Sequence, residues 1–351
     1  MATRYRACLI GCGRMGATID DEVQSHPNSY LWLPYSHAAG YAAHDRIDFV
    51  AVSDAVEEKA DEIRARYDVA KAYTDYREMI LAEKPDIVSV ATRPATHRDM
   101  VVFAAENGVK GIYCEKSLCG SMDEADAMLA ACEANGVKFN YGTQRRYTPL
   151  YNKMRELIDA GELGGLQVVI GHCGVSAAQW GHTHTTDMLL YLAGDPEVQY
   201  VQGSAMLSDE DRASLHIDSD PGIPTGYIRF ANGVHGHMLA SGGHEYEVSG
   251  SKGKLRSHNN GVTCLWRQAQ GSHGQLQDVP FPEPPHVSGT LGAITDIIDA
   301  IEQDRETLGN IRVACRSQEM ILGLIDSERQ GGARVPLPMA NRSLYVGKSD
   351  W

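Results

Sequence analysis

Between residues 5 and 141 the sequence alternates short apolar runs with segments of helical spacing, and this alternation limits the possible folds more than any other feature. The apolar runs occur at 5–11, 49–54, 86–91, 111–114 and 137–141. Runs that are mostly apolar are typical of strands buried on both faces of a sheet. Such strands, with helices of about three turns between them, form a parallel sheet that is covered on both sides. The sequence therefore predicts an N-terminal α/β domain.

A G-x-G-x-x-G motif follows the first predicted strand directly. It consists of Gly11, Gly13 and Gly16, with Arg14 and Met15 between the last two glycines. The first glycine allows a tight turn, the second lets the backbone approach a pyrophosphate, and the third lets a helix pack on the strand. The amino end of the following helix then offers free N–H groups to the phosphates. Because 35 glycines make chance matches common, the position of the motif carries the argument, and it indicates a Rossmann domain that binds a dinucleotide.

The end of the second predicted strand indicates which dinucleotide. Asp54 closes this strand, where a Rossmann fold places the carboxylate that accepts hydrogen bonds from the ribose hydroxyls of adenosine. No Arg or Lys follows before Lys59, so no neighbouring cation is at hand to pair with a 2′-phosphate. We therefore expect NAD rather than NADP.

The first helix region is longer than this motif requires. Asp54 follows Gly16 by 38 positions, whereas the usual spacing is about 20. The difference indicates an insertion at about 17–36, which contains Tyr30, Trp32 and Tyr35. Since the insertion leaves the phosphate-binding loop, it either roofs the ligand site or forms a surface or subunit contact.

A different pattern begins after Tyr147. Polar–apolar alternation at 166–171 and 234–241 is typical of antiparallel strands with one exposed face. Helical spacing occurs at 149–160, 183–192, 291–302 and 313–330. A chain of 351 residues is long enough for two domains. We expect a Rossmann NAD-binding domain over 1–146. We expect an α+β domain with an open, mostly antiparallel sheet over 147–351, for substrate binding and oligomerisation.

The composition excludes several classes of partner. A formal net charge of −14 argues against nucleic acid and anionic membrane surfaces. No apolar run approaches the roughly 20 residues that cross a bilayer, and the first residues lack the apolar core of a signal peptide. The eight cysteines show no Cys-x-x-Cys spacing, which is typical of reduced, buried thiols. We therefore expect a cytoplasmic protein with a small-molecule substrate and no metal.

Several motifs, taken in order, resemble the Gfo/Idh/MocA oxidoreductases, the relatives of glucose–fructose oxidoreductase and inositol dehydrogenase. Besides the glycine motif, they include Thr92-Arg93-Pro94 with His97, Cys114-Glu115-Lys116-Ser117, Gln144-Arg145-Arg146-Tyr147 and His184-Thr185-Thr186-Asp187. The resemblance covers nearly the whole chain and implies a homo-oligomer, a dimer or tetramer. The cofactor-binding residues that it implies are Gly11, Gly13, Arg14, Met15, Gly16, Asp54, Thr92, Arg93, Pro94, His97, Glu115 and Lys116.

The resemblance also implies a role for Lys116. The family carries Glu-Lys-Pro at the end of a strand, and its lysine lies beside the nicotinamide and the reacting hydroxyl. An ammonium group there can hydrogen-bond the oxygen, stabilise developing alkoxide charge and help to carry the proton. Ser117 stands where the family has proline. Since the family often has a cis peptide bond before that proline, the serine leaves this geometry open.

His184 matches the family's histidine in a His-x-x-Asp motif on the predicted helix 183–192. A neutral imidazole can accept the proton of a substrate hydroxyl. Asp187, one turn later on the same face, either orients the ring or packs. Inositol dehydrogenases usually carry Asp four residues before this histidine, and here the position is Trp180. The indole offers a stacking face for a sugar ring, and His182 could take over part of the polar role.

Two arginines follow the last predicted strand of the first domain. Arg145 and Arg146 fall at the mouth of the cleft between the domains. A guanidinium group suits a carboxylate, a sulfonate or paired hydroxyls, so one arginine would anchor the substrate. A salt bridge between the domains is equally plausible for the other. The candidate substrate-binding residues are Arg145, Arg146, Trp180, His182 and Asp187.

These residues lead to one expected function and one alternative. We expect an NAD-dependent oxidoreductase that acts on a CH–OH group of a sugar, sugar derivative or cyclitol, with Lys116 and His184 handling the proton. The alternative, which the resemblance also allows, is an NAD-dependent glycosidase. Such an enzyme oxidises C3, eliminates the aglycone, adds water and reduces the carbon again, and its NAD stays tightly bound.

Overall fold

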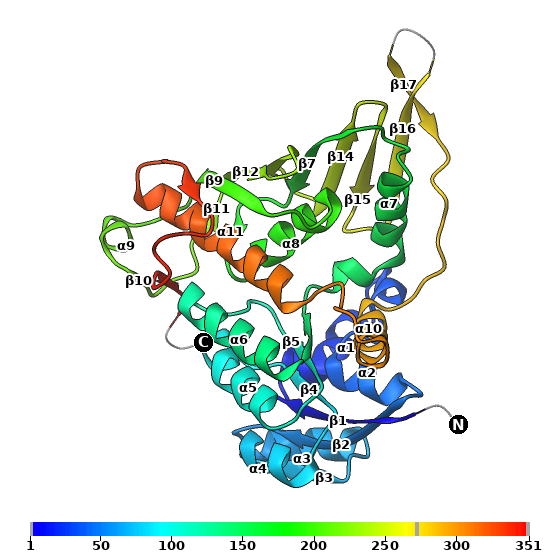
Figure 1. The fold of residues 1–351 in the computed structure, drawn as a ribbon. Coiled ribbons are helices and arrows are strands. Elements are labelled where there is room, and N and C mark those ends of the chain that lie inside the picture. Colours follow the sequence, from blue (N-terminus) through cyan, green and yellow to red (C-terminus); the bar gives the residue numbers. More distant parts are fainter. Residues whose placement is uncertain (1–2, 271–273, 349–351) are drawn as a thin grey trace.

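The computed structural model describes residues 3–270 and 274–348, which form two large sheets with their helices (Figure 1). The first sheet has six parallel strands in the order β3-β2-β1-β4-β5-β6. They are β1 (Tyr5–Ile10), β2 (Ile47–Ser53), β3 (Lys71–Tyr73), β4 (Ile87–Val90), β5 (Gly111–Cys114) and β6 (Lys138–Tyr141). This is the strand order of the dinucleotide-binding fold, so the predicted Rossmann domain is confirmed.

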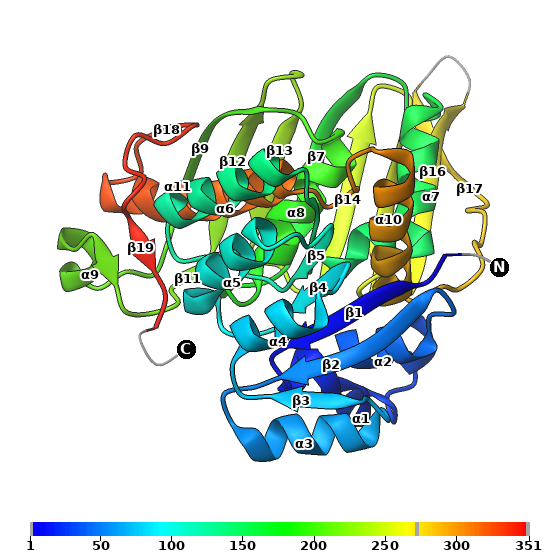
Figure 2. The same cartoon turned by 60° about the horizontal axis from the view of Figure 1, so that its bottom comes forward.

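Helices cover both faces of this sheet (Figure 2). The face of Cys8 and Ile10 packs against α4 (Tyr76–Glu83), α5 (Pro94–Glu106) and α6 (Met122–Asn135). The face of Ala7 and Leu9 packs against α2 (His37–Ala43), α3 (Glu57–Arg66) and α10 (Gly289–Gln303). The runs are apolar along their length because both faces are buried.

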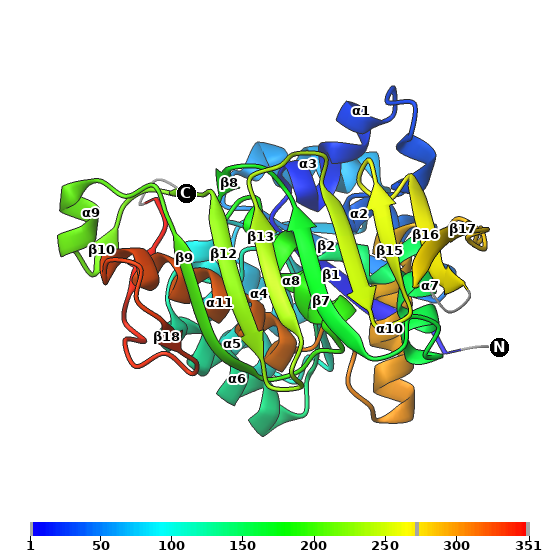
Figure 3. The same cartoon turned by 90° about the horizontal axis from the view of Figure 1, so that it is seen from above.

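The second sheet has nine strands in the order β17-β16-β15-β14-β7-β13-β12-β9-β18. All neighbours are antiparallel except β7 and β13. The strands are β7 (Leu166–His172), β9 (Val198–Ser204), β12 (Thr225–Phe230), β13 (His235–Leu239), β14 (Glu245–Gly250), β15 (Gly253–His258), β16 (Thr263–Gln270), β17 (Gln275–Val279) and β18 (Val335–Pro336). Helices α8 (His182–Ala193) and α11 (Ile311–Arg329) lie against one face, and Figure 3 shows the other face open. The predicted open, mostly antiparallel sheet is thus confirmed.

Shorter elements complete the fold. They are the π-helical turn η1 (Arg14–Thr18), the 3-10 turns η2 (Ser29–Leu31) and η3 (Gln144–Tyr147), helices α1 (Ile19–Val23), α7 (Pro149–Asp159) and α9 (Asp209–Ala213), and the strand pairs β8 (Ser176–Ala177) with β11 (Gly222–Ile223) and β10 (His216–Ile217) with β19 (Tyr345–Val346). No helix in the described ranges is long and apolar enough to cross a membrane. All eight cysteines are free thiols, and all but Cys264 are buried.

Helix α10 belongs to the second half of the chain but packs on the first sheet (Figure 2). Its Ile294, Ile297 and Ile298 share a buried cluster with residues of β1, β4 and β5. The packing is so close that a Cβ on Gly111 would lie 2.5 Å from the Ile297 side chain. The predicted domain boundary at 146/147 therefore assigns α10 to the second domain, although this helix covers one face of the first sheet.

Candidate active site

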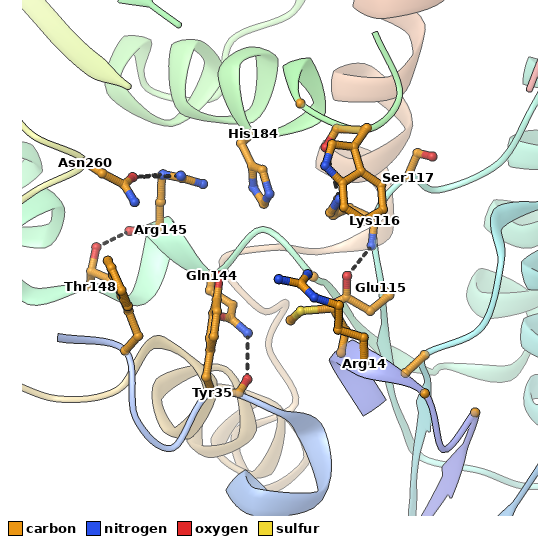
Figure 4. Close-up of a pocket in the computed structure, with 18 of the residues that line it drawn as sticks. Arg14, Tyr35, Glu115, Lys116, Ser117, Gln144, Arg145, Thr148, His184 and Asn260 are labelled. Atoms are coloured by element: carbon orange, nitrogen blue, oxygen red, sulfur yellow. Dashed lines mark hydrogen bonds between the residues drawn. The ribbon is translucent and has the colours of Figure 1, made fainter. Parts of the chain in front are cut away.

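A cavity of about 1540 Å³ lies where the carboxyl ends of the parallel strands face the second domain. Residues that directly follow β1, β2, β4, β5 and β6 line it from one side. From the other domain, Trp180, His184, His244 and Asn260 line it. Ligands of open α/β sheets bind at this edge of the sheet, so the cavity is the candidate active site (Figure 4).

The three motif glycines occupy three different environments. Gly11 has φ +95°, and a Cβ there would lie 2.6 Å from the carbonyl oxygen of Ala91. A Cβ on Gly16 would lie 1.9 Å from the carbonyl oxygen of Gly11, so only glycine permits this packing. Gly13 lines the cavity, and a Cβ there would have no neighbour within 4 Å. The turn, the open backbone and the close packing thus fit a loop that binds a pyrophosphate.

Asp54 also fits a dinucleotide. Its carboxylate accepts hydrogen bonds from the backbone amides of Cys12 at 2.8 Å and Val56 at 3.0 Å. These bonds fix the carboxylate beside the glycine loop, and Asp54 lines the cavity. Since two carboxylate oxygens can accept about four hydrogen bonds, capacity remains for the ribose hydroxyls.

The loop after β4 contributes a second wall to this end of the cavity. Thr92, Arg93 and Pro94 line it, as do Arg14 and Met15 from the glycine loop. Pro94 is the first residue of α5, a position that tolerates its missing N–H group. The helix thus begins at Pro94.

His97, which the resemblance assigns to the cofactor, lies outside the residues that line the cavity. Its ring is fully buried, with Nδ1 3.2 Å from the carbonyl oxygen of Leu118 and Nε2 3.3 Å from that of Thr92. The ring therefore joins the loop after β4 to the turn that follows Lys116.

Lys116 is the second residue after β5, and its peptide bond to Ser117 is cis. Its ammonium group donates a hydrogen bond to the carbonyl oxygen of Trp180 at 3.0 Å and lies 4.1 Å from the centre of the indole ring. Burial lowers the pKa of Lys116, and the positive charges of Arg145 and Arg14 lower it further, while Glu115 opposes this shift. The indole face that the sequence assigned to a sugar is thus shared with the ammonium group.

Glu115 is part of a buried network that the sequence did not reveal. Its Oε1 lies 3.1 Å from Nε2 of His37, and its Oε2 accepts a hydrogen bond from the Lys116 amide at 3.2 Å. His37 Nδ1 lies 2.8 Å from Ser89 Oγ, which lies 2.7 Å from the Tyr41 hydroxyl. Ser36 caps the helix that carries His37 and is a sequence signal for that helix. No sequence signal pairs the histidine with Glu115.

His184 points from α8 into the cavity between Arg145 and Lys116 (Figure 4). Its Nδ1 has no hydrogen-bond partner within the described residues. Burial holds the pKa of His184 well below its usual range, and the positive charges of Arg145, Lys116 and His244 add to this shift. The imidazole is therefore neutral near pH 7 and can accept a proton.

The two neighbouring arginines have different surroundings. Arg145 lines the cavity, and its Nε and Nη2 donate to the amide oxygen of Asn260 at 2.9 and 2.7 Å. Arg146 is fully buried outside the cavity lining. It donates to Asp187 at 2.7 Å and to both carboxylate oxygens of Asp195 at 2.8 and 2.9 Å. Arg146 thus forms the ion pair that the sequence left open for one of the two arginines, and it lies outside the cavity where a substrate would bind.

Asp187 and His182, two other predicted substrate-binding residues, both on α8, are likewise buried and lie outside the cavity lining. Asp187 faces Arg146 instead of orienting His184. His182 Nδ1 lies 3.1 Å from Thr185 Oγ1, and its Nε2 lies 3.0 Å from the carbonyl oxygen of Ile223. Burial lowers the pKa of His182 to about 4, so the ring is a neutral packing group. Trp180, in contrast, is 60% exposed and lines the cavity.

The insertion at 17–36 forms one wall of the cavity through Tyr30, Trp32 and Tyr35. Its two ends are tied together, because Asp20 accepts hydrogen bonds from the amides of Tyr35 and Ser36 at 2.8 and 2.9 Å. The carbonyl oxygen of Tyr35 accepts a hydrogen bond from Gln144 at 3.3 Å (Figure 4). It accepts a second one from Thr290 at 2.7 Å. These bonds hold the insertion against both halves of the chain.

Two further residues at the cavity were not identified from the sequence. Asn260 holds Arg145, and His244 lines the cavity from the loop after β13. Both have positive φ, +57° and +49°, in loops whose folded position a single sequence does not specify. No group of three or more His, Cys, Asp or Glu side chains in the described part of the chain could hold a metal ion.

Comparison with known proteins places the chain in a family. Residues 5–143 match the NAD-binding Rossmann fold of the Gfo/Idh/MocA oxidoreductase family, and residues 155–337 match its C-terminal alpha/beta domain. The chain is 25% identical to myo-inositol 2-dehydrogenase of Thermotoga maritima over 329 residues, which is 82% of this chain and 92% of that protein. It is 32% identical to inositol 2-dehydrogenase of Salmonella typhimurium over 307 residues, which is 76% of this chain and 89% of that protein.

Solved structures agree in fold. A levoglucosan dehydrogenase in complex with NADH and levoglucosan superposes with a TM-score of 0.73 at 19% identity, over 96% of this chain and 100% of that one. An aldose-aldose oxidoreductase from Caulobacter crescentus gives a TM-score of 0.74 at 18% identity, over 95% and 100%. The matches to the two family domains cover most of the chain. The protein therefore belongs to the Gfo/Idh/MocA family of oxidoreductases, and its N-terminal domain is an NAD-binding Rossmann domain.

Proposed function

We propose that this enzyme oxidises a CH–OH group of a sugar, sugar derivative or cyclitol with NAD, and that Lys116 and His184 handle the proton. One observation carries the proposal. Lys116 follows a strand of the NAD-binding domain, His184 lies on a helix of the other domain, and both line the same cavity as the glycine loop. The similarity to inositol dehydrogenases supports a cyclic polyol as substrate.

The surroundings of His184 suit a general base. A neutral imidazole accepts the hydroxyl proton while the carbon loses its hydrogen, and the low pKa of His184 keeps the ring neutral. Bound NAD supplies the acceptor for the hydride. Each turnover then converts one alcohol to a ketone and releases one proton.

Lys116 suits the reacting oxygen. Its ammonium group can donate a hydrogen bond to that oxygen and stabilise negative charge on it. In the structure this group donates one hydrogen bond to the Trp180 carbonyl, so two of its three N–H donors remain for the substrate. Trp180 then covers one side of the substrate with its exposed ring, an apolar surface on which the C–H groups of a sugar can pack.

The experiment follows NADH formation with free sugars and cyclitols and added NAD. Lys116→Ala and His184→Ala should each lower turnover by about 10²-fold or more, the usual effect of a positioned acid–base group. Near-wild-type turnover in either variant, with an unchanged melting temperature, would remove that residue from the mechanism. Release of aglycone from an aryl glycoside without growth of NADH would instead identify the glycosidase cycle. Assembly into a homo-oligomer stays a prediction, which gel filtration can test.

A further inference from the structure

Four basic side chains meet where the two domains face each other across the cavity. They are Lys116, Arg145, His184 and His244, and all of them line it. His184 points into the space between Arg145 and Lys116 (Figure 4). Burial lowers the pKa of His184 most, and Arg145, Lys116 and His244 lower it further. The lowered pKa values of His184 and His244 keep both rings neutral near pH 7, so Lys116 and Arg145 supply the positive charge here, in a chain whose net charge is −14.

Glu115 and Asp220 act on the charge of Lys116, and both hold other partners as well. Glu115 is engaged by His37 and by the Lys116 amide. Asp220 accepts two backbone amides at 2.7 and 2.9 Å. Glu283 also lines the cavity, from an exposed segment, and among the described residues it forms no ion pair with the basic cluster.

Arg145 is the member of the cluster best suited to bind an anion. Within the described ranges it forms no salt bridge, and its side-chain partner is the neutral amide oxygen of Asn260. That oxygen takes one hydrogen bond from Nε and one from Nη2, so about three of the five N–H donors of the guanidinium group are left. Asn260 thereby fixes the plane of the guanidinium group and leaves its other edge available to a planar carboxylate.

We propose that the substrate is a sugar acid or cyclitol acid, whose carboxylate binds Arg145 while a hydroxyl-bearing carbon faces His184 and Lys116. The inference rests on the proposed function and narrows its substrate class. The oxidised nicotinamide ring carries a positive charge of its own, and a neutral polyol would leave the remaining donors of Arg145 without a charged partner. A carboxylate supplies a negative charge and pairs with Arg145 in a region partly shielded from water, where ion pairs are stronger.

The test measures binding of matched ligand pairs to the protein loaded with NADH. Calorimetry compares glucose with glucuronate and galactose with galacturonate, and glucose 6-phosphate forms a third arm. Each acid should bind at least about ten-fold more tightly than its neutral partner, as expected of a charge-assisted hydrogen bond, and added salt should reduce this difference. Equal or weaker binding of the acids would overturn the inference. Tighter binding of the phosphate than of both acids would overturn the carboxylate assignment.

Variants test whether Arg145 causes the preference for acids over neutral sugars. Arg145→Gln should remove most of the advantage of the acids, and Arg145→Lys should keep part of it. Arg98→Gln is the matched control, because Arg98 lies outside the cavity lining and pairs with Asp99. A full acid preference in folded Arg145→Gln would overturn the role of Arg145.

The proposed function and this inference fail in different measurements. NADH formation tests oxidation of any member of the panel, whereas calorimetry tests the preference for acids without turnover. Oxidation of neutral sugars together with indifferent binding of acids would reject the inference alone. Preferential binding of acids without NADH formation from any ligand would reject the proposed function alone.

Discussion

Arg145 and Arg146 show how far residue type alone can assign a role. Both are arginines at the same predicted strand end, so the sequence supports one substrate anchor and one structural ion pair without saying which is which. The 3-10 turn η3 gives the two arginines different surroundings, because adjacent side chains of such a turn point to different sides. Arg145 reaches the cavity, and Arg146 reaches two carboxylates in the interior.

This difference predicts opposite effects of the same substitution. Arg146→Gln leaves Asp187 buried without its cation, so the free energy of unfolding should fall by about 3–5 kcal/mol. Arg145→Gln loses hydrogen bonds to one amide, so it should cost about 1 kcal/mol or less but lower kcat/KM. Urea unfolding and steady-state kinetics measure both effects. Equal stability of the two variants would contradict this division of roles.

The surroundings of His184 predict the pH dependence of catalysis. A general base is active above its own pKa, and activity is lost as the pH falls through that value. Since burial and neighbouring cations hold the pKa of His184 well below 6.5, the acidic limb of kcat/KM should lie below pH 6.5. Arg145→Gln should move this limb to higher pH, because it removes a positive charge that disfavours protonation. A limb above pH 6.5 that moves only with Lys116 substitutions would make the lysine the base.

At the scale of elements, five of the six strands of the first sheet were predictable because they are largely buried and therefore mostly apolar. The edge strand β3 was not predicted, because it is partly exposed and lacks an apolar run. Helix α2 was not predicted. Its contact with Glu115, the residue that directly follows β5, was not predicted either. The contact between His37 and Glu115 spans 78 positions, and it depends on how the insertion returns to the sheet. Local spacing carries no information on such a contact.

The insertion itself supports a prediction. Trp32 lines the cavity, and its ring centre lies 4.8 Å from that of His26 and 6.4 Å from that of Tyr35. Trp32→Ala should raise KM for the substrate about two- to ten-fold, the effect of losing one aromatic contact. The fold should persist, because the backbone bonds of Tyr35 anchor the segment.

The matched control for Trp32→Ala is Leu81→Ala, which removes an exposed apolar side chain from α4 outside the cavity lining. An unchanged KM in Trp32→Ala, together with a smaller assembly on gel filtration, would assign the insertion to a subunit contact instead of the substrate site.

At the scale of the whole molecule, α10 links the two halves of the chain. Its helical spacing was predictable over 291–302, but the sheet that it covers was not, because either sheet offers an apolar face. In the structure α10 packs beside α2 on the NAD-binding domain. A hydrogen bond from Ser288, just before α10, to the Pro34 carbonyl ties the start of α10 to the insertion. The NAD-binding domain is therefore completed by residues from the far end of the sequence.

This arrangement predicts that a fragment of residues 1–146 will not fold stably. Without α10, the surface that packs against Ile294, Ile297 and Ile298 is exposed to water. Burial of three such side chains contributes about 5–9 kcal/mol, which is comparable to the whole stability of a domain, about 5–15 kcal/mol. Fusing residues 288–304 to the fragment through a flexible linker should restore a cooperative urea transition, whereas a fusion carrying Ile297→Asp should not. Cooperative unfolding of the unfused fragment, at the same urea concentration as the fusion, would show that α10 is dispensable for this domain.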